Sequence, residues 1–164
     1  MKPAYANLSL ANGVRNAGIC SIKIVPREWI VADAIVDFNT GKVLTALQLL
    51  TGHSWLTLEF APTSYEYDEK PKSNKSGSYY EVTLSGILNK YTWDVHQVVE
   101  TLRYHECVAQ ITDRYKNTKL VGDQESGLVV TIGNNVKNTQ GGQQQVQIQL
   151  AMECEALPPY YTSS

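Results

Sequence analysis

Apolar and polar residues alternate with a period of two over much of this chain. In the clearest run, residues 145–153, every second residue from Val146 to Met152 is apolar. Successive side chains of a strand point to opposite faces, so the run predicts a half-buried strand with Gln145, Gln147 and Gln149 on its polar face. Residues 128–132 alternate in the same way, and the intervening residues 133–142 are rich in Asn, Gly and Gln. We therefore predict a hairpin with a long loop.

Further strands are predicted on both sides of one segment with a helical period. The shorter strand-like runs are residues 20–24, 29–38, 55–60, 79–88, 107–112 and 119–122. Residues 43–50 suit a strand or a helix equally. The helical segment has its apolar residues at positions i, i+3, i+4 and i+7, namely Val95, Val98, Val99 and Leu102. This spacing predicts an amphipathic helix over residues 94–103, with Thr92 as its cap and Asp94 favourably placed at the positive end of the helix dipole.

The order of elements predicts one mainly β (α+β) domain over residues 1–164: an antiparallel β-sandwich or barrel with one flanking helix and a long inter-strand arm. We expect an N-terminal extension over residues 1–17 and a C-terminal tail over 156–164. Residues 62–77 are rich in charge, proline and serine, so they offer little apolar surface to offset the entropy of ordering. We expect a loop there. Composition alone favours a solvated surface loop, and the alternative is an arm ordered against a neighbouring subunit.

Composition narrows the possible functions. The 164 residues have a net charge of −2 and are 18% charged, where about 25% is usual. Without clustered cations there is no electrostatic reason to expect nucleic-acid binding. No apolar run reaches the roughly 20 residues that span a bilayer, and no export signal is visible, so we expect no membrane association. Ten tyrosines against two phenylalanines suit a surface partly covered by neighbours, because tyrosine is enriched at interfaces.

The cysteines and histidines do not form a recognisable reactive or metal-binding pattern. Cys20, Cys107 and Cys154 are far apart and odd in number, so we expect reduced thiols rather than a zinc or redox site. Residues 105–107 are His, Glu and Cys, but adjacent side chains point in different directions. The sequence fixes no geometry between Cys107 and either His96 or His105. We predict no metal and no cofactor.

Paired carboxylates are the remaining candidates for catalysis. Asp33 and Asp37 would lie about 13 Å apart on a strand, wider than the paired carboxylates of glycosidases. Glu153 and Glu155 would lie about 7 Å apart and more simply mark a solvated or interface-facing edge. The nucleophile elbow, the P-loop and the dinucleotide-binding glycine motif are all missing from the sequence. We therefore predict that the protein is not an enzyme and has no catalytic residues.

The glutamines suggest a different role. Side-chain amides are concentrated on and before one strand, at Gln140, Gln143, Gln144, Gln145, Gln147 and Gln149. Amides are polar without being charged, so they can line an aqueous surface without holding DNA phosphates, or form hydrogen bonds across a subunit boundary. The alternative is an ordinary solvent face, although such faces usually carry more Lys and Glu. We interpret Gln145, Gln147 and Gln149 as a lumen or interface strand.

Several short segments resemble virion proteins encoded by phages and prophages of Bacteroidetes bacteria. They are residues 55–60 (WLTLEF), 64–69 (SYEYDE), 77–81 (GSYYE), 111–114 (ITDR), 119–122 (KLVG) and 149–161, which ends in EALPPYY. The order of elements also resembles phage tail-tube proteins and their relatives in tail terminators and contractile injection systems. In that superfamily a β-sandwich or barrel carries one flanking helix and a long loop, and subunits close into rings that stack into a tube.

The resemblance implies a structural virion protein of a phage tail or neck, made in the host bacterial cytoplasm. It implies homomeric rings, usually sixfold, that contact other tail or neck proteins and let DNA pass through the lumen without specific binding. The inter-subunit arm would carry Tyr65, Tyr67, Lys70, Lys72 and Lys75. Tube lumens in the superfamily are often acidic, whereas the candidate strand here is rich in glutamine, so tail tube, terminator and neck ring all remain open. The alternatives are a tail-associated module that binds carbohydrate or protein, and a small cytoplasmic enzyme.

Overall fold

The computed structural model describes residues 19–37, 39–40, 42–60, 64–88, 93–113, 116–135 and 145–161. In chain order its elements are β1 (Ile19–Pro26), the 3-10 helix η1 (Arg27–Trp29), β2 (Ile30–Ala32), β3 (Ile35–Asp37), β4 (Lys42–Thr45), β5 (Gln48–Leu49), β6 (Leu56–Leu58), β7 (Glu66–Asn74), β8 (Gly77–Ile87), α1 (Trp93–Arg103), β9 (Glu106–Asp113), β10 (Thr118–Val121), β11 (Leu128–Asn135), β12 (Gln145–Cys154) and β13 (Tyr160–Tyr161).

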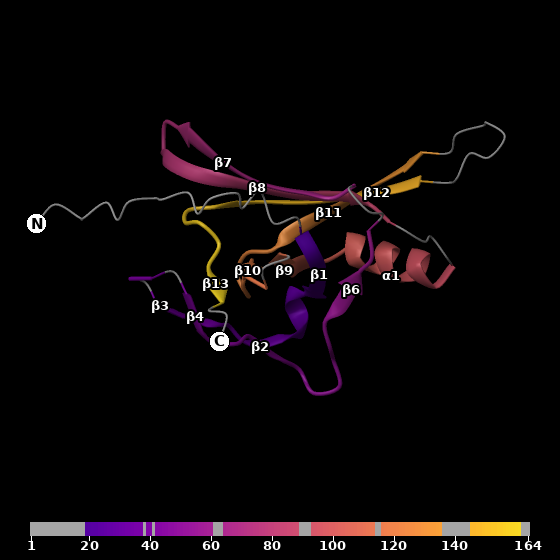
Figure 1. Cartoon of the computed structure of the whole chain (residues 1–164), viewed down its shortest axis with the longest axis horizontal. Coiled ribbons are helices and arrows are strands. Elements are labelled where there is room, and N and C mark those ends of the chain that lie inside the picture. Colours follow the sequence, from indigo (N-terminus) through magenta and orange to yellow (C-terminus); the bar gives the residue numbers. More distant parts are fainter. Residues whose placement is uncertain are drawn as a thin grey trace, which may run out of the picture.

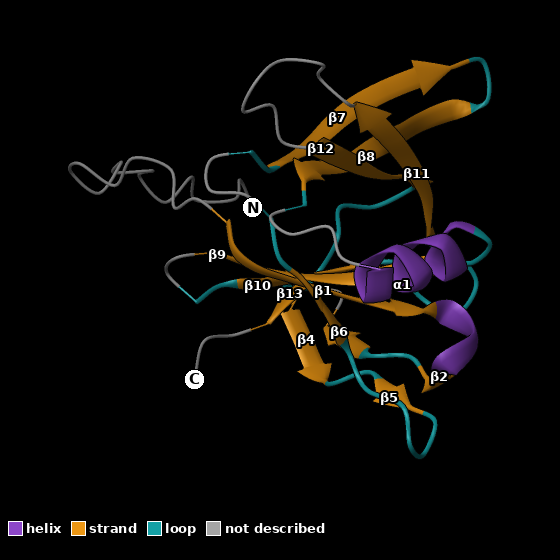
Figure 2. Ribbon diagram, turned by 90° about the vertical axis from the view of Figure 1, so that its right-hand side faces the viewer, coloured by secondary structure: helices purple, strands orange, loops and turns teal. Residues whose placement is uncertain are grey.

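Strand β9 is the branch point from which the two layers of the fold arise. Its residues pair with β1 along one edge, while β10 and then β11 share the other edge. One layer therefore runs in the order β6-β1-β9-β10-β13-β4-β3, and the other in the order β11-β12-β8-β7. Neighbouring strands are antiparallel except for β13 with β4. Figure 2 shows the two layers facing each other, with α1 beside them. The predicted β-sandwich with one flanking helix is confirmed.

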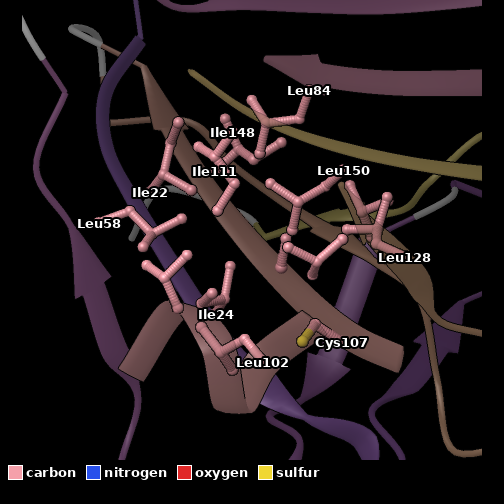
Figure 3. Close-up of a cluster of buried hydrophobic side chains, with 14 of the residues drawn as sticks. Ile22, Ile24, Leu58, Leu84, Leu102, Cys107, Ile111, Leu128, Ile148 and Leu150 are labelled. Carbon is pink, nitrogen blue, oxygen red and sulfur yellow. The ribbon is translucent and has the colours of Figure 1, made fainter. Parts of the chain in front are cut away.

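The main core lies between the two layers and depends on the period of two. Ile22 and Ile24 of β1 face Leu84 of β8 and Ile148 and Leu150 of β12, and all five side chains are buried. Figure 3 shows these side chains converging from both layers. Of the four apolar residues that the spacing predicts for the helix face, Val99 and Leu102 are buried in the same cluster and Val95 packs against it. Val98 is instead 41% exposed, so the apolar face is narrower than predicted. Burial of this shared surface is what holds the helix against the sandwich.

A second core covers the opposite face of the β1–β9–β10 layer. Val25, Val108 and Leu120 pack there against the segment that contains β2, β4 and β5. The central strands β1 and β9 are thus buried on both faces, which explains why they include adjacent apolar residues such as Ile24 and Val25. The ambiguous residues 43–50 form strand in β4 and β5, and Val43 and Leu47 supply apolar contacts to this second core.

Two expectations about loops are wrong. Residues 66–74 were expected to lie in a loop, but they form β7, which pairs with β8 over its whole length. The loop expected from residue 133 also begins later, because β11 continues to Asn135. Within the expected C-terminal tail, Tyr160 and Tyr161 form β13 between β10 and β4. The predicted N-terminal extension, the Thr92 cap and most of the 133–142 loop lie outside the described residues.

Candidate assembly surface

The glutamines singled out by the sequence lie on the outer face of the β11–β12–β8–β7 layer. Gln147 and Gln149 are exposed, while Ile148 and Leu150 between and beside them are fully buried. Gln145 is the first residue of β12 and pairs with Asn135 of β11, and its side chain lies outside the described part of the chain. The alternation of β12 therefore has the orientation that the sequence predicts.

Neighbouring strands extend this surface with further uncharged side chains. Residues at matching positions of β11, β12 and β8 form three rows across the sheet: Gly133–Gln147–Ile87, Thr131–Gln149–Ser85 and Val129–Ala151–Thr83. We call these nine residues the uncharged face. Its side chains are exposed or half-buried, and Val129 is 54% exposed. A three-strand surface without a charge is unusual for a solvent face, because such faces normally mix Lys and Glu among other polar residues.

Charged residues border the uncharged face along β7 and at the end of β12. Asp68 of β7 lies beside Thr83, and its carboxylate accepts a hydrogen bond from Lys70 at 2.9 Å. This hydrogen bond raises the pKa of Lys70. On the next row Glu153 lies directly opposite Glu81, whose carboxylate is 3.4 Å from the ammonium of Lys72. The ion pairs are therefore concentrated toward the tip of the β7–β8 hairpin.

The residues predicted for an inter-subunit arm divide into two groups. Tyr65 and Tyr67 are half-buried, and both contact their own chain: the Tyr65 ring lies 6.2 Å from the ring of Phe60, and Tyr67 packs against the main core. Lys70, Lys72 and Lys75 are exposed on β7 and at its turn. Of these five residues, only the three lysines are exposed on the surface.

A polar cluster between the two layers was not found by sequence reasoning. The Tyr67 hydroxyl donates to Glu69 Oε1 at 2.5 Å, and Lys119 Nζ of β10 lies 2.5 Å from the same oxygen. The Lys119 ammonium also lies 5.5 Å from the centre of the Tyr67 ring. Burial, and then the hydrogen bond to Glu69, raises the pKa of Tyr67 far above its usual value. No sequence signal pairs β7 with β10, because their contact is set by how the layers stack.

The outer edge of β7 is poorly suited to accept another strand. Within the described chain β7 pairs with β8 alone, so one edge faces away from the sheet. Pro71 has no backbone N–H, and a proline fits a paired strand only where the missing donor faces away from its neighbour. Lys70 and Lys72 flank it, and lysine on an edge strand disfavours further pairing. The sandwich therefore presents a protected edge at β7, next to its uncharged face.

The candidate reactive groups are buried or held by hydrogen bonds of their own chain. Burial raises the pKa of Cys107 to about 12 and also raises that of Cys154, so neither has the lowered pKa typical of a nucleophilic thiol. Asp37 accepts hydrogen bonds from Thr40 and from the Asn39 backbone in a turn. Among the described residues, no group of three or more His, Cys, Asp or Glu side chains is placed to hold a metal ion.

The remaining groups each contact a residue of the same element or of an adjacent one. His96 stacks on Trp93, with 5.4 Å between ring centres, and His105 Nδ1 lies 3.2 Å from the carboxylate of Glu28. Asp33 accepts a hydrogen bond from the backbone N–H of Gln124. These contacts connect neighbouring elements and do not converge on one cavity.

Comparison with protein families, with curated proteins and with solved structures finds no match to this chain. Helix α1 has 11 residues, and no helix within the described residues is long and apolar enough to cross a bilayer.

Proposed function

We propose that this protein is a structural virion protein of a phage tail or neck, which assembles into homomeric rings that form a conduit for DNA. The observation that carries the proposal is the uncharged face, a sheet surface of amide, hydroxyl, small and apolar side chains that spans β11, β12 and β8. The segments that resemble phage virion proteins, and the abundance of tyrosine, support the same class of protein.

An uncharged polar face suits either of two positions in a ring. Against a neighbouring subunit, it can be buried without the cost of desolvating unpaired ions, and its amides and hydroxyls can form hydrogen bonds across the boundary. Toward a lumen, it offers DNA phosphates no cations, so that no release of counterions holds the DNA in place. Both positions require only that the face is large and free of charge.

The β7–β8 hairpin supports contacts of the head-to-tail kind that rings require. Rings form when one surface of a subunit meets a different surface of the next and the rotation closes. The hairpin extends from the body of the sandwich (Figure 1) and presents Lys70, Lys72 and Lys75. Because the β7 edge is protected by Pro71, we propose that the hairpin contacts a neighbour through side chains, rather than by adding a strand.

The proposal is tested by placing a cation on the uncharged face. We expect the purified protein to form rings at high concentration, seen by negative-stain microscopy and by light scattering after size-exclusion chromatography. Gln149→Arg abolishes the rings if the face is an interface. If the face lines a lumen, the variant keeps its rings and gains salt-sensitive retention of DNA. Gln97→Arg, on the exposed side of α1, is the matched control and leaves both properties unchanged.

A wild-type protein that stays monomeric at high concentration and never forms rings or tubes would count decisively against the proposal. If Gln149→Arg still forms rings and does not retain DNA, the proposed ring assembly is supported. In that case the uncharged face is neither the interface nor the lumen surface.

A further inference from the structure

The segment that covers the second core also has an outer side. Strand β2 pairs with β5 and β3 pairs with β4, so these four strands form one irregular antiparallel ribbon. The inward side chains of the ribbon pack in the second core: Ile30, Ala34, Val36, Val43, Leu47 and Leu49. Most of its other side chains are exposed. The ribbon therefore has one buried side and one side that faces outward.

Apolar side chains dominate this outward side. Val31, Ile35 and Leu44 are 54–67% exposed, and Leu50, directly after β5, is 44% exposed. Nine large apolar side chains are exposed in the described part of the chain, and these are four of them. The carboxylate of Asp33, which is exposed among them, accepts a hydrogen bond from a backbone N–H. Exposed apolar side chains gathered in this way mark a contact with another molecule. We call the uncharged members the apolar ribbon: Val31, Ile35, Leu44, Thr45, Ala46, Gln48 and Leu50.

The apolar ribbon and the uncharged face lie on opposite sides of the molecule. The uncharged face is the outer side of the β11–β12–β8–β7 layer, whose inner side packs on the main core. The β1–β9–β10 layer lies on the other side of that core, and the second core lies between this layer and the ribbon. Figure 1 shows β8 and β12 at the top of the molecule and β2 and β4 at the bottom. A ring needs two different surfaces of this kind on each subunit, one for each neighbour.

The two surfaces match each other in chemistry and in length. Neither contains an ionised side chain, so their contact removes no charge from water and buries the exposed apolar groups of the ribbon. Charges lie at their borders, with the Asp68 ion pair beside one and Asp37 opposite Lys42 at the end of the other. An uncharged centre with a polar border is typical of protein interfaces. The ribbon extends up to about 20 Å from Leu44 to Leu50, enough to cover the roughly 13 Å between the outer rows of the uncharged face.

Charges at the end away from α1 favour the same orientation for both molecules. The tip of the β7–β8 hairpin and β3 both lie at that end (Figure 1). Lys75 is exposed at the tip, and neither Lys75 nor Asp37, the last residue of β3, forms an ion pair within the described chain. A hydrogen bond from Thr40 lowers the pKa of Asp37, so its carboxylate is ionised at neutral pH. Two subunits in the same orientation therefore place opposite charges at the same end of their contact.

We propose that the apolar ribbon binds the uncharged face of a second copy of this chain, with Lys75 of one subunit beside Asp37 of the next. The contact is head-to-tail, because each subunit uses its uncharged face toward one neighbour and its apolar ribbon toward the other. The inference rests on the proposed function, since the partner is another copy of the chain. It deepens that function by placing the uncharged face at the subunit boundary instead of the lumen.

A cation on either surface tests the contact. In the full-length protein, Leu44→Arg and Gln149→Arg are each expected to weaken self-association at least about tenfold, because each puts an unpaired charge into the boundary. Analytical ultracentrifugation measures the association, and unchanged melting temperatures establish that the variants are folded. Trp93→Arg is the matched control, because it replaces an apolar side chain that is 71% exposed at the start of α1, outside both surfaces. Its association should equal that of the wild type.

Mixing the two variants tests whether the surfaces bind each other. An equimolar mixture retains one intact contact, between the apolar ribbon of the Gln149→Arg subunit and the uncharged face of the Leu44→Arg subunit. Native mass spectrometry should therefore show one-to-one dimers of the two variants and no larger species, whereas each variant alone is monomeric. Dimers of either variant alone would mean that a surface binds its own copy, and this result overturns the inference. A mixture that stays monomeric where the wild type assembles overturns it as well.

Exchange of the two charges tests the orientation. Lys75→Glu and Asp37→Lys are each expected to weaken association by up to about fivefold. The double variant should recover most of the loss, because it restores opposite charges across the boundary. A double variant that associates no better than the single variants overturns the common orientation.

The outcomes separate this inference from the proposed function. Rings that persist in Leu44→Arg overturn the inference and leave the proposed function standing. One-to-one dimers in the mixture, together with open filaments of the wild type, support the contact and contradict the proposed ring. A wild-type protein that stays monomeric at every concentration overturns both.

Discussion

Lys119 Nζ of β10 lies 2.5 Å from Glu69 Oε1 of β7, which joins residues 50 positions apart and connects the two layers of the sandwich. Glu69 is only 16% exposed and also accepts a hydrogen bond from the Tyr67 hydroxyl, whereas Lys119 is 36% exposed. The lysine therefore compensates a largely desolvated carboxylate at the point where β7, an outer strand, meets the opposite layer. The contact anchors the β7–β8 hairpin to the opposite layer.

Removing this lysine should destabilise the fold. We expect Lys119→Met to lower the free energy of unfolding by about 1–2 kcal/mol, because Glu69 loses its ion-pair partner while staying mostly buried. The range allows for solvent screening at Lys119. Urea denaturation measures the change, and Lys23→Met, at an exposed position of β1, is the control. Equal stability of the two variants would contradict a structural role for the pair, and Glu69→Gln combined with Lys119→Met would recover part of the loss.

Gly86 of β8 should not tolerate a side chain. A Cβ added there would overlap the ring of Phe60, which packs against the inner face of the sheet. Overpacking of this kind costs about 1–3 kcal/mol, so Gly86→Ala should lower the melting temperature measurably. Gly133→Ala is the control, because the nearest atom to its added Cβ is 4.0 Å away. A loss at Gly86 no greater than at Gly133 would show that Phe60 moves aside without cost.

Stability should fall in alkaline solution because of a buried thiol. The pKa of Cys107 rises from 9.0 to about 12 on folding, so folding favours the protonated thiol. Its contribution is fully present below pH 9 and is lost as the pH rises toward 12, by up to about 1.4 kcal/mol per pH unit. The raised pKa of Tyr67 adds to the loss above pH 10. Denaturation at several pH values should give a shallower fall between pH 9 and 10 for Cys107→Ala, and identical profiles would argue against the assignment.

Replacing Pro71 should allow the edge of β7 to pair with strands of other molecules. Pro71→Val restores an outward N–H to the strand and adds a β-branched residue, so we expect soluble aggregates that bind thioflavin T. Ser73→Val is the matched control, because it adds the same side chain two residues away without adding a donor. Light scattering at equal protein concentration compares them. If both variants aggregate equally, side-chain hydrophobicity explains the effect and the missing donor does not.

Local patterns in the sequence were sufficient for much of the fold and for part of the candidate surface. The i, i+3, i+4, i+7 spacing around Val99 predicted α1, and the alternation of residues 145–153 predicted both β12 and the exposure of Gln147 and Gln149. These features depend only on the periods of helix and strand, which are read within a single element. The rest of the uncharged face was not predictable, since Thr131, Ser85 and Gln149 become neighbours only through the register of three strands.

Residues 66–74 show most clearly that local composition cannot predict a strand whose formation depends on its pairing partner. Their charge and their proline suggest a loop, yet they form β7, because β8 offers a long pairing partner and Tyr67 reaches the main core. The same holds for Tyr160 and Tyr161, which form a strand only because β4 and β10 lie on either side of them.

The sequence by itself determined the low charge, the mainly β class with a single helix, and the polar side of β12, since each follows from composition or from a period within one segment. The tertiary structure alone decided the pairing of Lys119 with Glu69 and the extent of the uncharged face. These features bring together residues from distant segments, and their positions depend on strand register and on the packing of one layer against the other, which no local pattern encodes.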